Sequence, residues 1–447
     1  MSKPNLERLK FAYPALIIGL MTTAFIVAKT GRDALFFQGK GIFQLPIATL
    51  AIVAASVPLA VLFVKAMKTW GARPARIAIL LMTASILAIS APFLQPGDST
   101  LLFNIFMFIP ASFGIMFASL WLLVSDMFEN TPKPEAARTF ARIGASSLAG
   151  GIVGGFVAKG LVPYLEPQWL IFISALLILV VAALVTIAHS KFPTNIPAGK
   201  SGDKKDSGYL KPLSNPSAVL LIFISMTGAL AGLLIDVQFY IAATSANLGS
   251  KGNAGFFANF YIMLNFFSLL FQLFITPRIQ QKFGVHSGLM ILPLALVGGA
   301  GFASAAATAF SLSALRVTEG GLRSSIHRSL WEQAFIPIVS SDRSVVKLAV
   351  DGIAARIAEG AAAAGIYFWV QQVAPGGVHA EPLDTRWMIW LTFVTVVVWL
   401  VIAQKLRTRV RKQQAPIAAA PLPEPEVDCE RFPDQCPCTT ELGKGIR

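Results

Sequence analysis

The chain has 447 residues, of which 55% are hydrophobic and only 13% are charged. Soluble domains carry about 25% charged residues, so this composition excludes an ordinary soluble protein and predicts an integral membrane protein in a lipid bilayer. The formal net charge of +14 does not require a nucleic-acid partner, because the cytoplasmic loops of membrane proteins collect lysine and arginine.

Apolar runs of about 20 residues, the length that spans a bilayer, recur between polar breaks along the chain. They predict an all-α fold with twelve transmembrane helices, at residues 11–36, 42–65, 74–94, 100–124, 138–162, 168–189, 216–243, 254–277, 285–305, 306–327, 345–372 and 386–405. The run at 306–327 is the least typical of a membrane span, because its second half is polar.

A stretch rich in Pro, Gly, Ser and Lys divides these helices six and six. We expect a six-helix bundle over 1–189, a cytoplasmic linker over 190–215, a second six-helix bundle over 216–405 and a disordered cytoplasmic tail over 406–447. The halves resemble each other as repeats, since Trp70–Gly71 after the second helix matches Phe283–Gly284 after the eighth. Two such repeats are typical of major-facilitator transporters, which bind substrate between the halves.

Lysine and arginine gather near both termini and in every second connection, which predicts that both termini are cytoplasmic. The three cysteines, Cys429, Cys436 and Cys438, lie in the tail, so no disulfide framework holds the bundle together. Their spacing lacks the closed four-ligand set of a zinc site, and we expect neither a metal nor a cofactor. The sequence contains no Walker-type phosphate loop, HExxH or GxSxG motif, which argues against an enzyme.

The end of the first helix carries three charges, Lys29, Arg32 and Asp33, at the spacing i, i+3, i+4. The two bases would suit an anion, with Asp33 orienting one of them. The alternative is an interfacial cluster in which Arg32 and Asp33 form a structural pair.

The tenth helix carries a polar stripe, because Arg316, Glu319, Arg323 and His327 follow one another at helical spacing. A charge near the bilayer centre costs at least ~2.5–3.5 kcal/mol and normally faces a cavity or a partner. The stripe therefore either lines a substrate pathway or forms an internal Arg316–Glu319 bridge that holds helices together.

Two further helices carry charges. Asp236 on the seventh helix is a candidate for proton coupling or for a salt bridge that gates the pathway. On the eleventh helix, Arg356 and Glu359 stand at i, i+3, which favours a local pair. Carboxylates without a basic partner would be candidates to carry protons.

Three stretches carry a family resemblance: KTGRDALFF at Lys29–Phe37, and the segments Ser119–Gly155 and Glu319–Gly360. They are similar to the first-helix signature of the nucleotide (ATP/ADP) translocases of plastids and intracellular bacteria and to corresponding segments of their free-living bacterial relatives. The resemblance implies a major-facilitator-like fold, exchange of an anionic nucleotide and a bacterial inner membrane. It casts Arg32 as a phosphate contact, with Lys29 beside it.

We therefore predict a monomeric secondary active transporter that moves a small anionic or zwitterionic solute by alternating access. A nucleotide or another phosphorylated metabolite is the leading case. The residues expected to bind it are Lys29, Arg32, Arg316 and Arg323, and those expected to couple or gate transport are Asp33, Asp236, Glu319, Arg356 and Glu359. The alternatives are a proton-coupled exporter of a less charged molecule and a transport-inactive membrane scaffold or sensor.

Overall fold

The computed structural model describes residues 3–38, 41–96, 100–128, 133–191, 215–244, 249–306, 308–335, 346, 348–373 and 386–419. Within these ranges the regular elements are all helical. The first set of helices is α1 (Lys3–Phe36), α2 (Gly41–Trp70), α3 (Ala72–Ser90) with a short 3₁₀ turn η1 (Ala91–Phe93), α4 (Thr100–Met127), α5 (Lys133–Leu161) and α6 (Pro167–Lys191).

The second set contains three π-helical segments, η3, η4 and η5. Its elements are α7 (Pro216–Thr244), α8 (Gly249–Leu270), η3 (Phe271–Ile275), α9 (Thr276–Gly288), α10 (Ile291–Ala305), α11 (Ala309–Leu322), η4 (Arg323–His327), α12 (Arg328–Ala334), η5 (Leu348–Ala354), α14 (Ala355–Val373) and α15 (Arg386–Ala419). The last helix runs on to Ala419, past the predicted end at residue 405. The expected linker falls almost wholly outside the described residues, as do the three cysteines.

Ten helices of the described chain are long and apolar enough to cross a membrane, and each matches a predicted span. The two other predicted spans, 138–162 and 306–327, are helical as well, in α5 and in α11 with η4. Both are more polar than the rest. Helix α5 is rich in Gly, Ala and Ser, and α11 carries Arg316 and Glu319.

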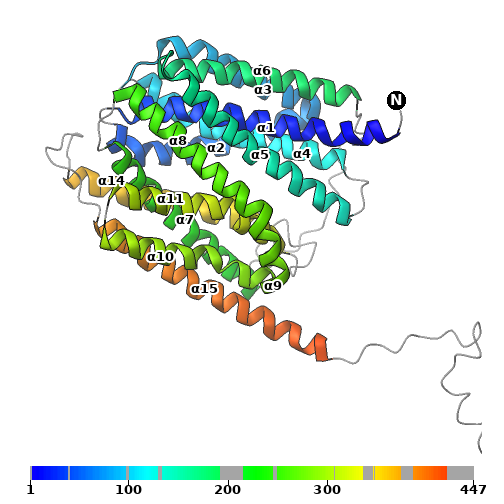
Figure 1. Cartoon of the computed structure of the whole chain (residues 1–447), viewed down its shortest axis with the longest axis vertical. Coiled ribbons are helices and arrows are strands. Elements are labelled where there is room, and N and C mark those ends of the chain that lie inside the picture. Colours follow the sequence, from blue (N-terminus) through cyan, green and yellow to red (C-terminus); the bar gives the residue numbers. More distant parts are fainter. Residues whose placement is uncertain are drawn as a thin grey trace, which may run out of the picture.

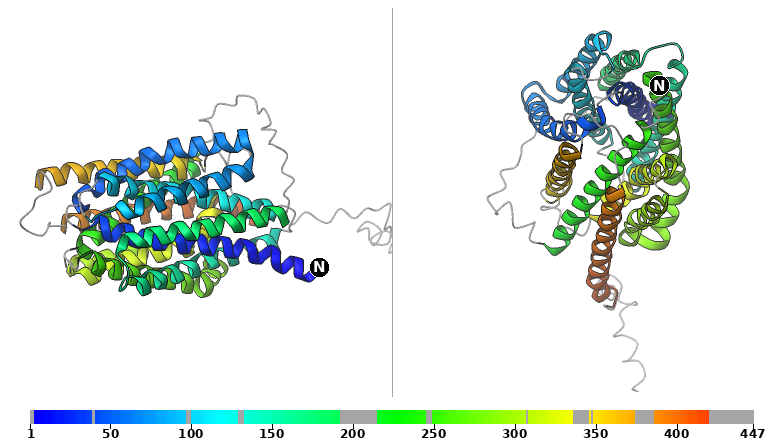
Figure 2. Two further views of the ribbon diagram at one scale, coloured as in Figure 1. Left: turned by 90° about the horizontal axis from the view of Figure 1, so that it is seen from above. Right: turned by 90° about the vertical axis from the view of Figure 1, so that its left-hand side faces the viewer.

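The helices pack in two groups. Helix α1 packs against α4, α5 and α6, whereas α7 packs against α11, α14 and α15. Figure 1 shows α1, α3, α4, α5 and α6 together in its upper part and α10 and α15 in its lower part, with α8 running obliquely between them. The start of α1 and the end of α15 lie at the same end of the bundle (Figure 1). The left view in Figure 2 shows the helices running roughly along one common direction, and the right view looks at the bundle from one end.

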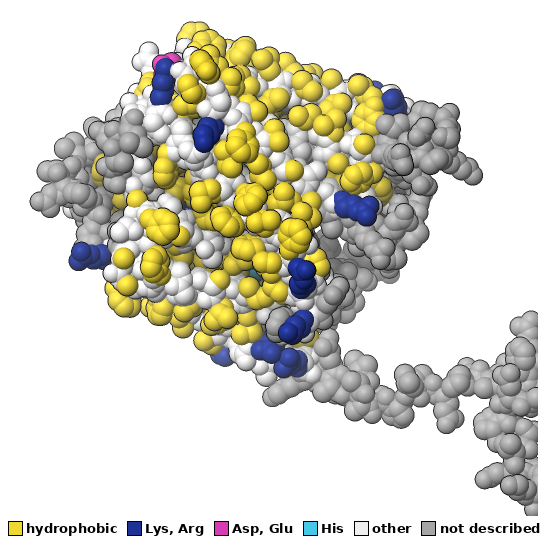
Figure 3. Space-filling model, in the orientation of Figure 1, with side chains coloured by type: hydrophobic (Ala, Val, Ile, Leu, Met, Phe, Trp, Pro, Cys, Tyr) yellow, Lys and Arg dark blue, Asp and Glu magenta, His cyan; other side chains and the backbone are white. Residues whose placement is uncertain are grey.

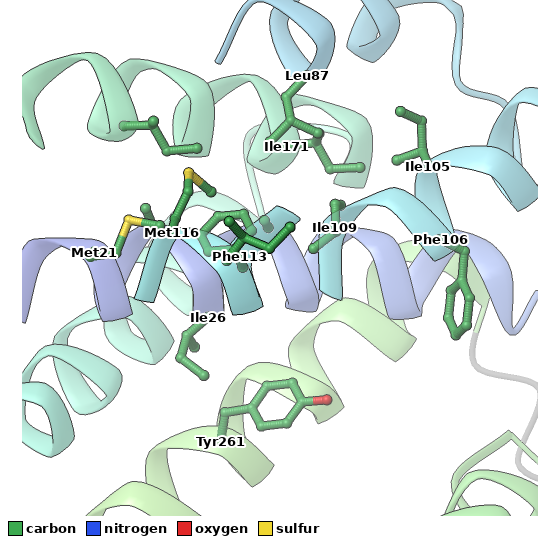
Figure 4. Close-up of a cluster of buried hydrophobic side chains, with 14 of the residues drawn as sticks. Met21, Ile26, Leu87, Ile105, Phe106, Ile109, Phe113, Met116, Ile171 and Tyr261 are labelled. Carbon is green, nitrogen blue, oxygen red and sulfur yellow. The ribbon is translucent and has the colours of Figure 1, made fainter. Parts of the chain in front are cut away.

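Two main apolar cores hold the helices, and the larger one extends from the first group into α7, α8 and α14. Figure 4 shows part of the first, where Met21 of α1, Phe113 and Met116 of α4 and Ile171 of α6 meet, each at most 1% exposed. The second core is centred on Trp399 of α15. The face of the molecule seen in Figure 3 is covered largely by apolar side chains, drawn in yellow, as expected of a surface in contact with lipid tails.

Helices of the two groups touch through α5 and α8, α1 and α8, and α2 and α14. Glycines of α5 allow close approaches both to α8 of the second group and to α1 of the first. A Cβ at Gly151 would overlap the side chain of Asn265 on α8, and a Cβ at Gly150 would overlap the backbone of Gly19 on α1. Helix α5 therefore packs closely on both sides, as the small residues at Gly150–Gly154 and Gly151–Gly155, spaced by four, allow.

Candidate functional site

A cavity of about 850 Å³ lies between the two groups of helices. Its wall takes residues from α1, α2 and α4 on one side and from α7, α8, α11, α14 and α15 on the other. Most of the charges predicted to be functional reach this wall, namely Lys29, Arg32, Asp236, Arg316, Glu319, Arg323, Arg356 and Glu359. Asp33 is the one exception, because it is fully buried behind Arg32.

The cavity is bounded at one end by a cluster around Asp33, and we call this the Asp33 end. Arg32 donates from Nε to Oδ1 of Asp33 at 2.7 Å. The other carboxylate oxygen accepts hydrogen bonds from the hydroxyls of Tyr240 on α7, at 3.1 Å, and Tyr261 on α8, at 2.6 Å. One carboxylate of the first group thus joins two helices of the second.

Aromatic rings fill the space around this cluster. The guanidinium of Arg32 lies 4.2 Å from the ring centre of Phe106 on α4. Phe37 stacks on Tyr240 with 4.2 Å between ring centres, and Phe257 of α8 packs beside both. Figure 4 shows Phe106 and Tyr261 at the edge of the first core, on different helices. The contacts of Asp33 are therefore excluded from water, which strengthens them.

Apart from Arg328, which is exposed, Lys29 is the one base of the cavity without an ion pair to an acid of the described chain. Its ammonium lies 4.7 Å from the ring centre of Tyr261, and it forms no ion pair with a carboxylate of the described chain. A cation on an aromatic face is stabilised by roughly 0.5–2 kcal/mol, less than an ion pair with a negatively charged solute would supply. Lys29 can therefore receive an anion without first releasing an internal acid.

The polar stripe of α11 forms an extended network. Arg316 pairs with both Asp236 of α7 and Glu319, and Glu319 also accepts from Nε of Arg323. Arg323 donates further to the backbone oxygen of Gly228 on α7, at 2.8 Å. The side chain of Glu319 is 2% exposed, whereas that of Asp236 is 34% exposed. The network is therefore held by Glu319, and Asp236 is its member most open to the cavity.

The Arg316–Glu319 bridge, one of the two alternatives for this stripe, is present, and both of its residues line the cavity. The local pair expected on α14 is present as well, with 2.7 Å between Arg356 Nη1 and Glu359 Oε2. It is partly exposed, so it contributes little to stability.

The cavity has a small surplus of positive charge. The described residues that line or adjoin it include six bases, Lys29, Arg32, Arg316, Arg323, Arg328 and Arg356, and five acids, Asp33, Asp236, Glu319, Asp351 and Glu359. This leaves one net positive charge. Lys29 and the exposed Arg328 are the two bases without an acidic partner in the described chain, and Lys29 is the more buried of them. A single negative charge on a bound solute would make this part of the cavity neutral.

The sequence did not identify several residues of the wall. Tyr261, Trp331 and Trp399 all line the cavity. Tyr261 and Trp399 occur in apolar runs, where an aromatic residue usually belongs to the core or faces lipid, and Trp331 lies in a polar stretch after His327. Trp399 in particular is 1% exposed and packs against Gly228. The Trp399 ring fits against α7 because Gly228 has no side chain. This pairing joins two helices that are far apart in sequence, so the pattern of neither helix alone reveals it.

No protein-family model and no curated protein matches the sequence at a significant level. Solved structures do match. A crystal structure of the nucleoside transporter NupG superposes with a TM-score of 0.58 at 13% identity, over 89% of this chain and 98% of that chain. The chain shares the overall helical fold of that transporter.

Two more structures of this fold are similar to the chain over nearly their whole length. The POT family transporter PepTSo matches with a TM-score of 0.61 at 11% identity, over 88% of this chain and 98% of that one. A bacterial homologue of the iron transporter ferroportin, in an inward-facing state, matches with a TM-score of 0.61 at 14% identity, over 91% and 99%. At these identities the likeness concerns the fold, and the substrate has to be argued from the cavity.

Proposed function

We propose that the chain is a secondary active transporter that moves a small anionic or zwitterionic solute by alternating access. The observation that carries the proposal is Lys29, a half-buried ammonium in a cavity between two helix groups, with no carboxylate partner in the described chain. A buried charge is costly unless it is matched, so an uncommitted one marks a place where a charged ligand is expected.

The fold supports the same mechanism. Twelve helices in two six-helix repeats, with both termini cytoplasmic, would place the Asp33 end on the outer side of a bacterial inner membrane. The contacts of Asp33 with Tyr240 and Tyr261 would then hold the outer end shut, so the cavity would load from the cytoplasm. Breaking those contacts and closing the opposite end would complete the cycle within a single monomer.

The charges bear on the substrate class. One surplus positive charge favours a monoanion, or a zwitterion whose cationic group meets Asp236. A phosphorylated metabolite such as a nucleotide, with more negative charge, would have to displace Asp236 from Arg316. Because Asp236 is the most exposed acid of that network and Glu319 the least, this exchange of partners is physically reasonable and leaves the inner bridge intact.

The alternative function, proton-coupled export of a less charged molecule, rests on the same Asp236. A carboxylate that is 34% exposed and held by one arginine is the group of this network that can be protonated most easily. Exchange that ignores a pH gradient would favour the anion transporter, and transport driven by that gradient would favour the exporter. The third reading, an inactive scaffold, required every charge to be paired and no cavity, and Lys29 and the cavity speak against it.

The proposal is tested in proteoliposomes with a panel of radiolabelled monocarboxylates, phosphate monoesters, amino acids and nucleotides. For the solute that is taken up, Lys29→Gln should lower uptake at limiting concentration by about 10–100-fold, since a hydrogen bond to a charged group is worth about 1.5–3 kcal/mol. Lys29→Arg should keep part of it. The matched control is Lys159→Gln, at an exposed lysine of α5. Uptake that is unchanged in Lys29→Gln would refute the assignment.

A further inference from the structure

A second group of cavity residues is not explained by the charges. His327 of η4, Trp331 of α12 and Trp399 of α15 pack together and all line the cavity. His327 stacks on Trp331, with 5.5 Å between ring centres, and meets Trp399 edge to face at 5.6 Å. The guanidinium of Arg323 lies over the ring of Trp399, 5.8 Å from its centre, so this aromatic group adjoins the charged network.

Two polar atoms of this group are left unsatisfied. Nδ1 of His327 and Nε1 of Trp399 are buried, and neither has a hydrogen-bond partner in the described chain. The residues themselves are 9% and 1% exposed. A buried polar group without a partner costs about 1–3 kcal/mol, so two of them side by side next to a cavity point to a ligand that satisfies both.

The backbone here is unusual as well. The segment Arg323–His327 is π-helical, and so is η5, whose Asp351 accepts the indole N–H of Trp331 at 2.8 Å. Single π-helical turns are rare and occur often at functional sites. The bond to Asp351 fixes the plane of the Trp331 ring, which prepares a rigid face for a planar partner.

We propose that His327, Trp331 and Trp399 form a second subsite, which binds a planar, uncharged ring that carries a hydrogen-bond acceptor. The indole N–H of Trp399 can only donate, so the ligand must accept there, while a neutral imidazole can donate or accept. This inference rests on the proposed function and refines it. The transported solute is then an acid whose charged end meets Lys29 and whose heteroaromatic ring meets Trp331 and Trp399.

The two subsites set the length of that solute. Arg316, which borders the acid subsite, and Arg323, which borders the ring subsite, are two helical turns apart on one helix, or about 10 Å. A ring joined to an acid by a short chain spans that distance. A very small acid such as acetate would reach one subsite only and would bind weakly.

The test compares two acids of equal length, 4-(3-pyridyl)butyrate and 4-cyclohexylbutyrate, by titration calorimetry on the purified full-length protein. The cyclohexyl acid is the more hydrophobic, so a pocket that selects for hydrophobicity alone would bind it more tightly. We expect the pyridyl acid to bind at least about tenfold more tightly. The preference should disappear in Trp399→Phe, which keeps a ring but loses the N–H, and in His327→Leu. The control Trp390→Phe, at a 60% exposed position of the same helix, should keep it.

The design separates this inference from the transport proposal. Lys29→Gln should weaken both acids and leave the ratio of their dissociation constants unchanged, because Lys29 meets only the acid end. A ratio near one in the wild-type protein, no binding of the pyridyl acid, or a preference that survives in His327→Leu overturns the ring subsite even if transport is found. An intact preference in a protein that transports none of the panel overturns the transporter and leaves the subsite standing.

Discussion

Removing the hydroxyls of Tyr240 and Tyr261 should loosen the Asp33 end. These two groups donate from α7 and α8 to one carboxylate oxygen of Asp33 on α1, so they tie the two helix groups together. The double substitution Tyr240→Phe/Tyr261→Phe keeps both rings, including the stack of Phe37 on Tyr240, and leaves the Arg32–Asp33 pair in place. The perturbation is therefore confined to two hydrogen bonds.

The expected effect follows from the burial of Asp33, which is fully shielded from solvent. A hydrogen bond to a charged group contributes about 1.5–3 kcal/mol, and the lower value applies because opening lets water replace the hydroxyls. Two such bonds amount to ~3 kcal/mol, or roughly a hundredfold change in the equilibrium between closed and open forms. A protein that is 99% closed would become about half open.

The assay uses cysteine accessibility. All three native cysteines lie at 429–438, so replacing them with serine should leave the described bundle untouched. A new cysteine at Ala243, which is 5% exposed and lies one turn beyond Tyr240 on α7, reports on opening. In nanodiscs its rate of reaction with a polar maleimide should rise by more than tenfold in the double variant. Tyr164→Phe, at an 83% exposed tyrosine, is the matched control.

An unchanged labelling rate in the double variant would refute the argument, since it would mean that the aromatic packing alone keeps this end closed. A rate that rises equally in Tyr164→Phe would refute it too, because the effect would then come from losing any hydroxyl. If the single variants each raise the rate by nearly the full amount, the two bonds act as a unit rather than additively.

Two further predictions concern stability. Glu319→Gln should lower the free energy of unfolding by about 3–5 kcal/mol, because it removes the charge of the buried acid that Arg316 and Arg323 share. Glu359→Gln should cost under about 1 kcal/mol, because its pair is partly exposed. Denaturant titration in detergent checks both, and equal losses would contradict the network. Gly150→Ala should lower the thermal midpoint, because the added Cβ would force α5 away from α1. Gly144→Ala has open space around its Cβ, so it should raise the midpoint slightly or leave it unchanged. A thermal-shift assay in which the two variants behave alike would contradict the close packing.

The sequence was enough to predict the helical fold, because bilayer-length apolar runs leave few alternatives. It also predicted the pairs that lie on one helix, such as Arg316–Glu319 and Arg356–Glu359, since helical spacing alone brings them together. It could not predict that Arg316 also reaches Asp236 on α7, because that contact depends on how two helices are placed.

The residues that sequence reasoning missed share a physical cause. Tyr261 and Trp399 are amphipathic rings, and their apolar bodies are indistinguishable in sequence from core material. Their polar atoms become informative only when their surroundings are known. The hydroxyl of Tyr261 bonds Asp33, whereas the buried indole N–H of Trp399 has no hydrogen-bond partner in the described chain. Likewise, no pattern in the sequence predicts the π-helical turn that carries His327.

If Lys29 binds the anion as proposed, its position would connect that binding to the closure of the Asp33 end. Its ammonium rests on the ring of Tyr261, and the hydroxyl of the same ring holds Asp33. An anion that draws Lys29 off this ring removes one contact that stabilises the closed form. Its binding free energy is therefore more favourable in the open form by the free energy of that contact. A ligand shifts a conformational equilibrium only through such a difference in affinity. With a cation–π contact of roughly 0.5–2 kcal/mol, one bound anion shifts the equilibrium between closed and open forms about 2–30-fold. That is enough to make opening depend on the solute, while the Asp33 end stays closed without it.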